Sequence, residues 1–486
     1  MKKYILIILC CLTSFPLWSY NVNMIVEHYS VDQGLPNNTV NCTLKDRDGF
    51  IWFGTWYGLC CFDGVKFKTF NKQEHDSDVP PRKIQRIVED KNGYIWVKTI
   101  DRKLYVFNKV TECFHAVYDD MKNYSENIQV IKLQNTAEGD VLLLTKDKNL
   151  LLAGVDEKGQ VTIKILFDSR DEINKHDYTL KHHVLCETEE YISWIGTDYK
   201  VSAVHKGAEL ASRPADFITS KINSGDKDSF TSFFEDGRKV WVGDRAGIFY
   251  SIDVRTGLVN RYVLSEIKGA ISNLLVTPAG YVYLSVAGQG TYEYDLAERR
   301  LQKINTEMND AMVTHAFIDQ YDKIWFHENE KALIYYDPLN HTAKRFPFTM
   351  FGKITTLYSE DAGERGLFFL SPAGEAWLFD REHAEMVYIN KLKQLSNDRA
   401  NQQFYHLMLD NDGVLWLSSA DEGVYCMNFP KKQFNLLSLS PQSAGRENYA
   451  TGVRALFQSK SGDIWVGTRW QSVYRMDRNG VTKHGF

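Results

Sequence analysis

The sequence predicts an all-β fold of four-stranded antiparallel sheets, and three observations support this. A pattern of four short apolar strands recurs ten times along the 486 residues. Each copy carries a large apolar side chain at the same place, and successive copies are 42 to 52 residues apart. No long amphipathic helix pattern competes with these strands. A fixed period of about 40 to 50 residues is typical of β-propeller blades.

The first 19 residues predict a secretory signal peptide. Lys2 and Lys3 precede the apolar run 4–12, and small residues follow up to Ser19. The run is shorter than the roughly 20 residues of a membrane-spanning helix, although an uncleaved anchor is the alternative. Cleavage near Ser19 leaves 55 basic and 62 acidic residues, a net charge of −7. Such a charge disfavours a nucleic-acid partner.

The clearest copy spans residues 37–70. Its first two strands flank the turn Asp46-Arg47-Asp48-Gly49, for which we expect a tight type I′ hairpin. A large side chain, the anchor, follows in the second strand and is expected to fill the layer between neighbouring sheets. The ten anchors are Trp52, Trp96, Leu142, Trp194, Trp241, Tyr283, Trp325, Phe368, Trp416 and Trp465.

The division of these copies into rings has two solutions. Residues 20–348 are expected to form a seven-bladed propeller, with segment 25–30 as the outer strand of its closing blade. Residues 349–486 then give the first three blades of a second, incomplete propeller. The alternative places the break within 431–448 and puts nine copies in the first unit. In both, sheets stack until a ring closes, because one sheet cannot bury both apolar faces.

The repeat also carries a family resemblance. Residues 34–40 (GLPNNTV), 46–55 (DRDGFIWFGT) and 58–59 (GL), with the later copy 462–468 (GDIWVGT), resemble the two-component regulator propeller repeat of Bacteroides-type hybrid two-component sensors. The resemblance implies a periplasmic sensor that binds oligosaccharides released from a glycan and signals as a homodimer in the full-length protein. It implies no cofactor and no catalysis within this chain.

Members of that family carry two seven-bladed propellers, a membrane helix, a histidine kinase, a receiver and a DNA-binding part. This chain reaches Phe486 without a kinase sequence. We therefore expect a fragment or a stand-alone relative, which would touch the membrane only through a missing C-terminal part or an uncleaved N-terminus.

A ligand is expected at one edge of the sheets, where the loops between second and third strands emerge beside the connections between blades. Sugars are bound by aromatic rings that stack on their C–H faces and by charged or amide groups that contact hydroxyl, carboxylate or sulfate groups. The candidates in these loops are Trp56, Tyr57, Arg102, Tyr199, Arg245, Gln289 and Glu328.

Other chemistry is weakly supported. The turns 46–49 and 410–413 resemble the start of a calcium loop but lack its twelfth-position glutamate, so no metal site is expected. Two alternative functions stay open. One is a propeller lyase or glycosidase that uses His182 or His183 with Tyr199 and Arg245, and the other is a protein-binding scaffold. The mature cysteines are expected to be free thiols, namely Cys42, Cys60, Cys61, Cys113, Cys186 and Cys426.

Overall fold

The computed structural model divides the chain into two units, residues 1–429 and 430–486. It describes residues 25–70, 80–121, 129–146, 149–167, 180–188, 190–196, 201–207, 215–216, 230–304, 313–328, 331–348, 358–361, 366–371, 375–389, 404–428, 453–468, 473–476 and 482–485. The signal peptide predicted for residues 1–19 lies outside these ranges.

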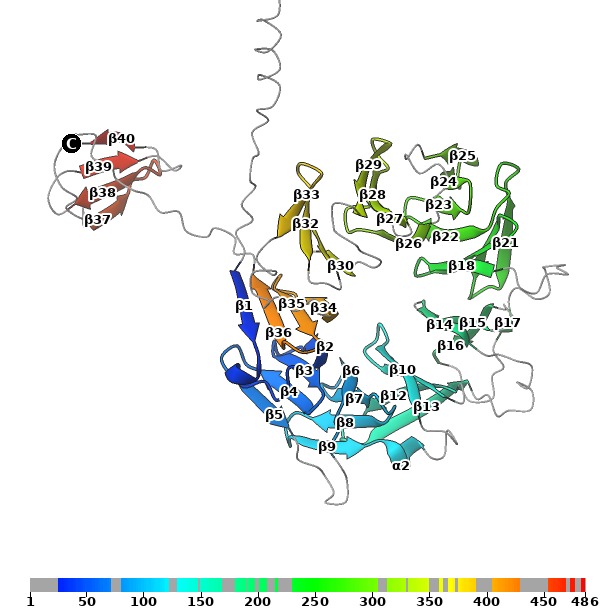
Figure 1. The fold of residues 1–486 in the computed structure, drawn as a ribbon, viewed down its shortest axis with the longest axis horizontal. Helices are drawn as coiled ribbons and strands as arrows, with labels where there is room; N and C mark the ends of the chain where they lie inside the picture. Colours follow the sequence, from blue (N-terminus) through cyan, green and yellow to red (C-terminus); the bar gives the residue numbers. More distant parts are fainter. Residues whose placement is uncertain are drawn as a thin grey trace, which may run out of the picture. The chain divides into compact units, whose positions relative to one another are not determined.

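The described part of the first unit contains nine four-stranded antiparallel sheets, which follow one another in chain order (Figure 1). Sheets 1 to 4 are β2 (Val40–Lys45), β3 (Ile51–Thr55), β4 (Gly58–Phe62), β5 (Phe67–Phe70); β6 (Ile84–Glu89), β7 (Ile95–Thr99), β8 (Leu104–Asn108), β9 (Cys113–Ala116); β10 (Val130–Asn135), β11 (Val141–Thr145), β12 (Leu150–Val155), β13 (Val161–Phe167); and β14 (Leu180–Glu187), β15 (Tyr191–Gly196), β16 (Val201–His205), β17 (Ala215–Asp216).

Sheets 5 to 8 are β18 (Phe230–Glu235), β19 (Lys239–Asp244), β20 (Ile248–Asp253), β21 (Leu258–Val263); β22 (Ile271–Val276), β23 (Tyr281–Val286), β24 (Gly290–Asp295), β25 (Arg300–Lys303); β26 (Val313–Ile318), β27 (Ile324–Glu328), β28 (Ala332–Asp337), β29 (Thr342–Pro347); and β30 (Tyr358–Asp361), β31 (Leu367–Leu370), β32 (Ala376–Asp380), β33 (Glu385–Ile389). Sheet 9 combines β34 (Phe404–Leu409), β35 (Leu415–Ser419) and β36 (Val424–Asn428) with β1 (Ile25–Tyr29). The short helices η1 (Val31–Gln33) and α2 (Tyr118–Met121) lie in connections.

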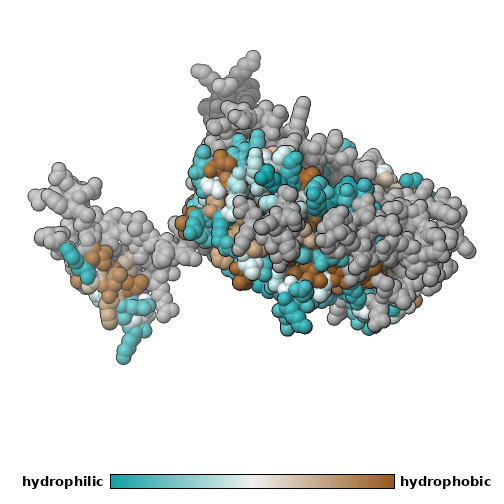
Figure 2. Space-filling model, turned by 90° about the horizontal axis from the view of Figure 1, so that it is seen from below, coloured by the Kyte–Doolittle hydropathy of each residue, from teal (hydrophilic) through white to brown (hydrophobic). Residues whose placement is uncertain are grey.

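The second unit contains one sheet in its described residues. Its strands are β37 (Val453–Gln458), β38 (Ile464–Thr468), β39 (Val473–Met476) and β40 (Thr482–Gly485). Leu456 and Phe457 on β37 are 69% and 65% exposed, and apolar residues gather on the displayed face of this unit (Figure 2).

The first turn of sheet 1 differs in detail from the expected type I′ hairpin. In sheet 1, Gly49 has φ +91°, whereas Arg47 and Asp48 are not among the residues with positive φ. The loop is three residues long, since the Asp46 N–H bonds to the Phe50 carbonyl at 2.9 Å. Asp46 Oδ1 accepts the N–H groups of Asp48 and Phe50 at 3.0 and 2.9 Å. A glycine that accepts positive φ after a type I turn completes this hairpin.

The same aspartate links the turn to the anchor. Trp52 Nε1 donates to Asp46 Oδ2 at 2.7 Å, and both side chains are buried. A hydrogen bond to a charged acceptor contributes about 1.5–3 kcal/mol. The bond recurs between Trp96 and Asp90 at 2.9 Å, Trp241 and Asp236 at 2.8 Å, Trp325 and Asp319 at 3.2 Å, and Trp416 and Asp410 at 3.1 Å.

Nine clusters of buried apolar side chains connect the sheets of the first unit. Each cluster joins one sheet to the next, and the cluster that contains Trp416 joins sheet 9 back to sheet 1. Every anchor whose side chain is described in this unit lies in the cluster between its own sheet and the following one. The expected position of the anchors between sheets is therefore confirmed, and the arrangement is consistent with propeller blades.

The structure differs from the predicted division at residue 348. Strand β1 pairs with β36 from Ile25↔Asn428 to Tyr29↔Val424, rather than closing the sheet that ends near residue 348. Phe348 packs with Phe369 and Phe379 of sheet 8, so sheet 7 is already covered by its successor. The observed boundary between 429 and 430 is close to the alternative break. The repeat period predicts where the sheets occur along the chain, but it does not predict which strand pairs with β1.

Two further expectations concern membranes and thiols. None of the helices in the described ranges is long and apolar enough to cross a membrane. The cysteines whose side chains are described are free thiols, as expected: Cys42, Cys60, Cys61, Cys113 and Cys426.

Candidate ligand-binding rim

The loops between the second and third strands of sheets 1 and 2 meet the entries into the next sheets. Lys83, just before β6, donates its N–H to the Trp56 carbonyl at 3.0 Å, and its own carbonyl accepts the Ile100 N–H at 2.9 Å. Val130, at the start of β10, likewise donates to the Arg102 carbonyl at 2.9 Å. These bonds place the loops and entries on one edge, which we call the hairpin rim: residues 56–57, 80–83 and 100–103.

Trp56 and Tyr57 form the aromatic part of the hairpin rim. Their side chains are 43% and 61% exposed. The Thr55 hydroxyl accepts the Tyr57 N–H at 3.1 Å and donates to the Gly58 carbonyl at 2.8 Å, which fixes the loop. The Lys83 ammonium lies 5.1 Å from the Trp56 ring centroid, a cation–π distance. The arrangement offers an exposed ring surface bordered by a positive charge.

Lys83 and Arg102 hold an unusual backbone conformation on this rim. Their φ angles are +50° and +68°, in the left-handed region that side chains other than glycine seldom occupy. In that conformation, Lys83 uses both its N–H and its carbonyl to bridge the loops of sheets 1 and 2. The hydrogen bonds of the rim therefore hold these two residues in that conformation.

The structure brings only part of the predicted set together. Trp56, Tyr57 and Arg102 lie on adjacent sheets, whereas Arg245 lies in the exposed β19–β20 hairpin of sheet 5. Tyr199 lies outside the described residues.

Gln289 and Glu328 have structural contacts instead. The Gln289 carboxamide accepts the Lys268 N–H at 2.8 Å and donates to the Glu266 carbonyl at 3.2 Å. Glu328 is 3% exposed and pairs with Arg345 at 2.9 Å. Both side chains therefore bond to neighbouring groups in their own regions of the fold. Residue type and loop position alone do not predict these contacts.

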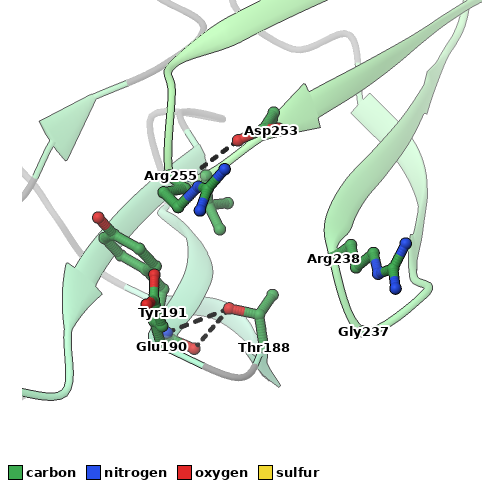
Figure 3. A pocket seen from close by; sticks show the side chains of 8 residues that line it. Thr188, Glu190, Tyr191, Gly237, Arg238, Asp253 and Arg255 are labelled. Carbon is green, nitrogen blue, oxygen red and sulfur yellow. Dashed lines mark hydrogen bonds between the residues drawn. The ribbon is translucent and has the colours of Figure 1, made fainter.

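A pocket on the opposite edge was not predicted from the sequence. It lies among the β14–β15, β18–β19 and β20–β21 turns of sheets 4 and 5, with a volume of about 300 Å³. Figure 3 shows Arg255 beside Tyr191 and Thr188, whereas Arg238 extends away from them. The two guanidinium groups therefore do not converge on one point. The only sequence signal was the pair of arginines in adjacent turns.

A group of three carboxylates has the spacing of a metal site but contains a lysine. Oxygens of Asp46, Asp48 and Glu89 lie within 4.8 Å of one another. The Lys109 ammonium is 3.1, 2.7 and 2.8 Å from them, and these carboxylates raise the pKa of Lys109 against the effect of burial. The turn 46–49 thus has a cation of its own, which agrees with its interpretation as a hairpin.

The residues required for a catalytic alternative are not assembled in the described part of the chain. The side chains of His182 and His183, and the whole of Tyr199, lie outside it, while Arg245 is on a separate hairpin. The described residues therefore do not test that alternative.

Comparisons with known proteins identify the repeat. Residues 34–57 match the family described as "Two component regulator propeller", and Trp56 and Tyr57 are the last two residues of the match. No curated protein matches the chain.

Several solved structures are similar to this chain. The extracellular domain of what is described as the hybrid two component system BT3049 from B. thetaiotaomicron has 15% identity and a TM-score of 0.32, covering 95% of this chain and 66% of that one. The extracellular domain described as belonging to the hybrid two component system BT4673, from the same organism, has 16% identity and a TM-score of 0.30, covering 94% and 61%. The Dos1 propeller has 11% identity and a TM-score of 0.44, covering 83% and 93%. The chain thus spans less than two thirds of the length of the two extracellular domains.

Proposed function

We propose that this chain is the ligand-binding propeller region of a two-component sensor, located in the periplasm and binding oligosaccharides released from a glycan. The observation that carries the proposal is the regulator-propeller repeat at 34–57, which ends on the exposed pair Trp56 and Tyr57. Exposed aromatic rings beside charged groups are the usual means of binding sugar.

In this proposal the chain binds its ligand without chemical turnover. Occupancy would be transmitted as a change in the packing of a homodimer of the full-length protein. Such a change requires that the ligand bind one arrangement better than the other. In the full-length protein, a kinase would read this change.

Isothermal titration with a panel of oligosaccharides tests the proposal. A binder from the panel is then titrated into the Trp56→Ala/Tyr57→Ala variant, for which we expect affinity to fall at least about tenfold, or about 1.4 kcal/mol. Tyr388→Ala is the matched control, because Tyr388 is 42% exposed on the outer strand β33. Unchanged affinity in the double variant, or no binding by any member of the panel, would overturn the proposal.

A further inference from the structure

Strands β6 and β7 of sheet 2 and their flanking loops carry five cations that form no ion pair with a carboxylate of the described residues. Arg86 on β6 lies directly opposite Lys98 on β7. Arg82 and Lys83 precede β6, and Arg102 lies in the hairpin after β7. Within the described ranges, none of these five side chains forms an ion pair with a carboxylate. We call the five residues the cation cluster.

The pairing of Arg86 with Lys98 is unfavourable for the fold by itself. Like charges directly opposite each other on neighbouring strands are destabilising. Lys98 is only 6% exposed, and its ammonium donates to neutral acceptors, Gln85 Oε1 at 2.8 Å and the Ile131 carbonyl at 2.6 Å. Burial, followed by the charges of Arg102 and Arg86, lowers the pKa of Lys98 to about 8. The positive charges of Arg86 and Arg102 therefore repel that of Lys98.

Two partly buried cations in other sheets are paired with carboxylates. Arg381 pairs with Asp319 at 2.5 Å and with Asp361 at 2.7 Å. Lys45 pairs with Asp410 and Asp412 at 3.4 and 2.5 Å.

The cation cluster departs from that pattern. In its hairpin, Asp101 accepts the Thr99 hydroxyl at 2.5 Å and lies 3.5 Å from Lys103, which is outside the cluster. Positive charge that lacks a carboxylate partner among the described residues can be compensated by a bound anion.

We propose that the cation cluster, together with Trp56 and Tyr57 of the adjacent sheet, selects oligosaccharides that carry carboxylate or sulfate groups. The inference rests on the proposed function and names the ligand class of the hairpin rim together with the adjoining strands β6 and β7. Guanidinium groups bind such oxyanions with paired hydrogen bonds. The backbone bonds of Lys83 to Trp56 and Ile100 hold the aromatic and cationic parts side by side.

The test uses two matched pairs of probes on the full chain. An oligogalacturonide tetramer is compared with its methyl ester, and a sulfated galactan tetramer with its desulfated form. The variant Arg86→Gln/Arg102→Gln removes two charges from the cluster. Arg299→Gln/Arg300→Gln is the matched control, because it also removes two arginines and Arg299 likewise has positive φ, +54°.

We expect at least one charged probe to bind about tenfold or more tightly than its uncharged partner, and to lose that advantage in the cluster variant but not in the control. Preference for the carboxylate or the sulfate pair identifies which oxyanion is recognised. Equal binding of charged and uncharged probes overturns this inference and leaves the proposed function standing, as does a charge preference that persists in Arg86→Gln/Arg102→Gln. If no oligosaccharide binds, charged or uncharged, both proposals are overturned.

Discussion

The closure of the first unit by β1 and β36 can be tested with a cysteine that the chain already has. Glu27 on β1 lies directly opposite Cys426 on β36. Opposed residues of antiparallel strands have Cα atoms about 4.5–5.5 Å apart, within the roughly 4.4–6.8 Å that a disulfide spans. The thiol introduced by Glu27→Cys should therefore form a disulfide with Cys426 under mild oxidation.

The expected stabilisation is large because the bridge would close a loop of about 400 residues. In the chain-entropy model such a loop gives about 6 kcal/mol, although about 2–4 kcal/mol is typical of measured disulfides. Formation should be slow, since burial raises the pKa of the Cys426 thiol to about 12 and leaves little thiolate at neutral pH.

Peptide mapping by mass spectrometry and denaturant unfolding with and without reductant measure the bridge and its effect. Lys68→Cys is the matched positive control, because Lys68 lies opposite the native Cys61 within sheet 1, and burial raises the pKa of Cys61 to about 12 as well. If the Lys68→Cys bridge forms while the thiol introduced by Glu27→Cys remains reduced, β1 does not close the unit against β36. That result would reopen the division at residue 348.

Three further outcomes are expected. Trp52→Phe removes the hydrogen bond to Asp46 and should lower the free energy of unfolding by about 1.5–3 kcal/mol in urea; an unchanged midpoint would remove the turn–anchor link from the account of stability. Lys98 has a folded pKa of about 8 against 10.5 when unfolded, so the folded protein binds fewer protons between these values. Its contribution to the free energy of unfolding should thus rise, by up to about 3 kcal/mol, as pH increases through that window, and a wild-type minus Lys98→Gln difference that is flat from pH 7.5 to 10 would refute this. Glu328→Gln weakens the charge-assisted hydrogen bond to Arg345, whose side chain is 30% exposed, and should destabilise the fold by about 1.5–3 kcal/mol with little effect on ligand affinity; the reverse outcome, measured by calorimetry, would restore Glu328 to the binding residues.

The anchors and turns could be predicted from the sequence because each depends on local chemistry. The first hairpin of sheet 1 is defined by two local features. One is an aspartate at the start of the turn with a glycine at its end, and the other is an aromatic residue six positions after that aspartate. Trp52 and Asp46 therefore meet as soon as the hairpin forms. The type of hairpin was harder to predict from the sequence, because it depends on whether one or two residues of the turn have positive φ.

The sequence predicted where the candidate site lies, but it did not predict which of the loop residues are available to a ligand. Loop position placed Trp56, Tyr57 and Arg102 on the rim, where the structure has them. It also suggested Gln289 and Glu328, whose contacts are with Lys268, Glu266 and Arg345. Those partners are 17 to 23 residues away in sequence, so the loop motif contains no information about them.

The sequence by itself determined the number and placement of the sheets, because each blade is a local meander whose period is written in its turns and anchors. Only the tertiary structure decided how the series closes, since the partner of β1 is almost 400 residues distant along the chain and any sheet with an open edge could have accepted it. It also decided that Arg86 and Lys98 stand opposite each other with no carboxylate partner among the described residues, because charge compensation depends on neighbours that a linear pattern does not specify.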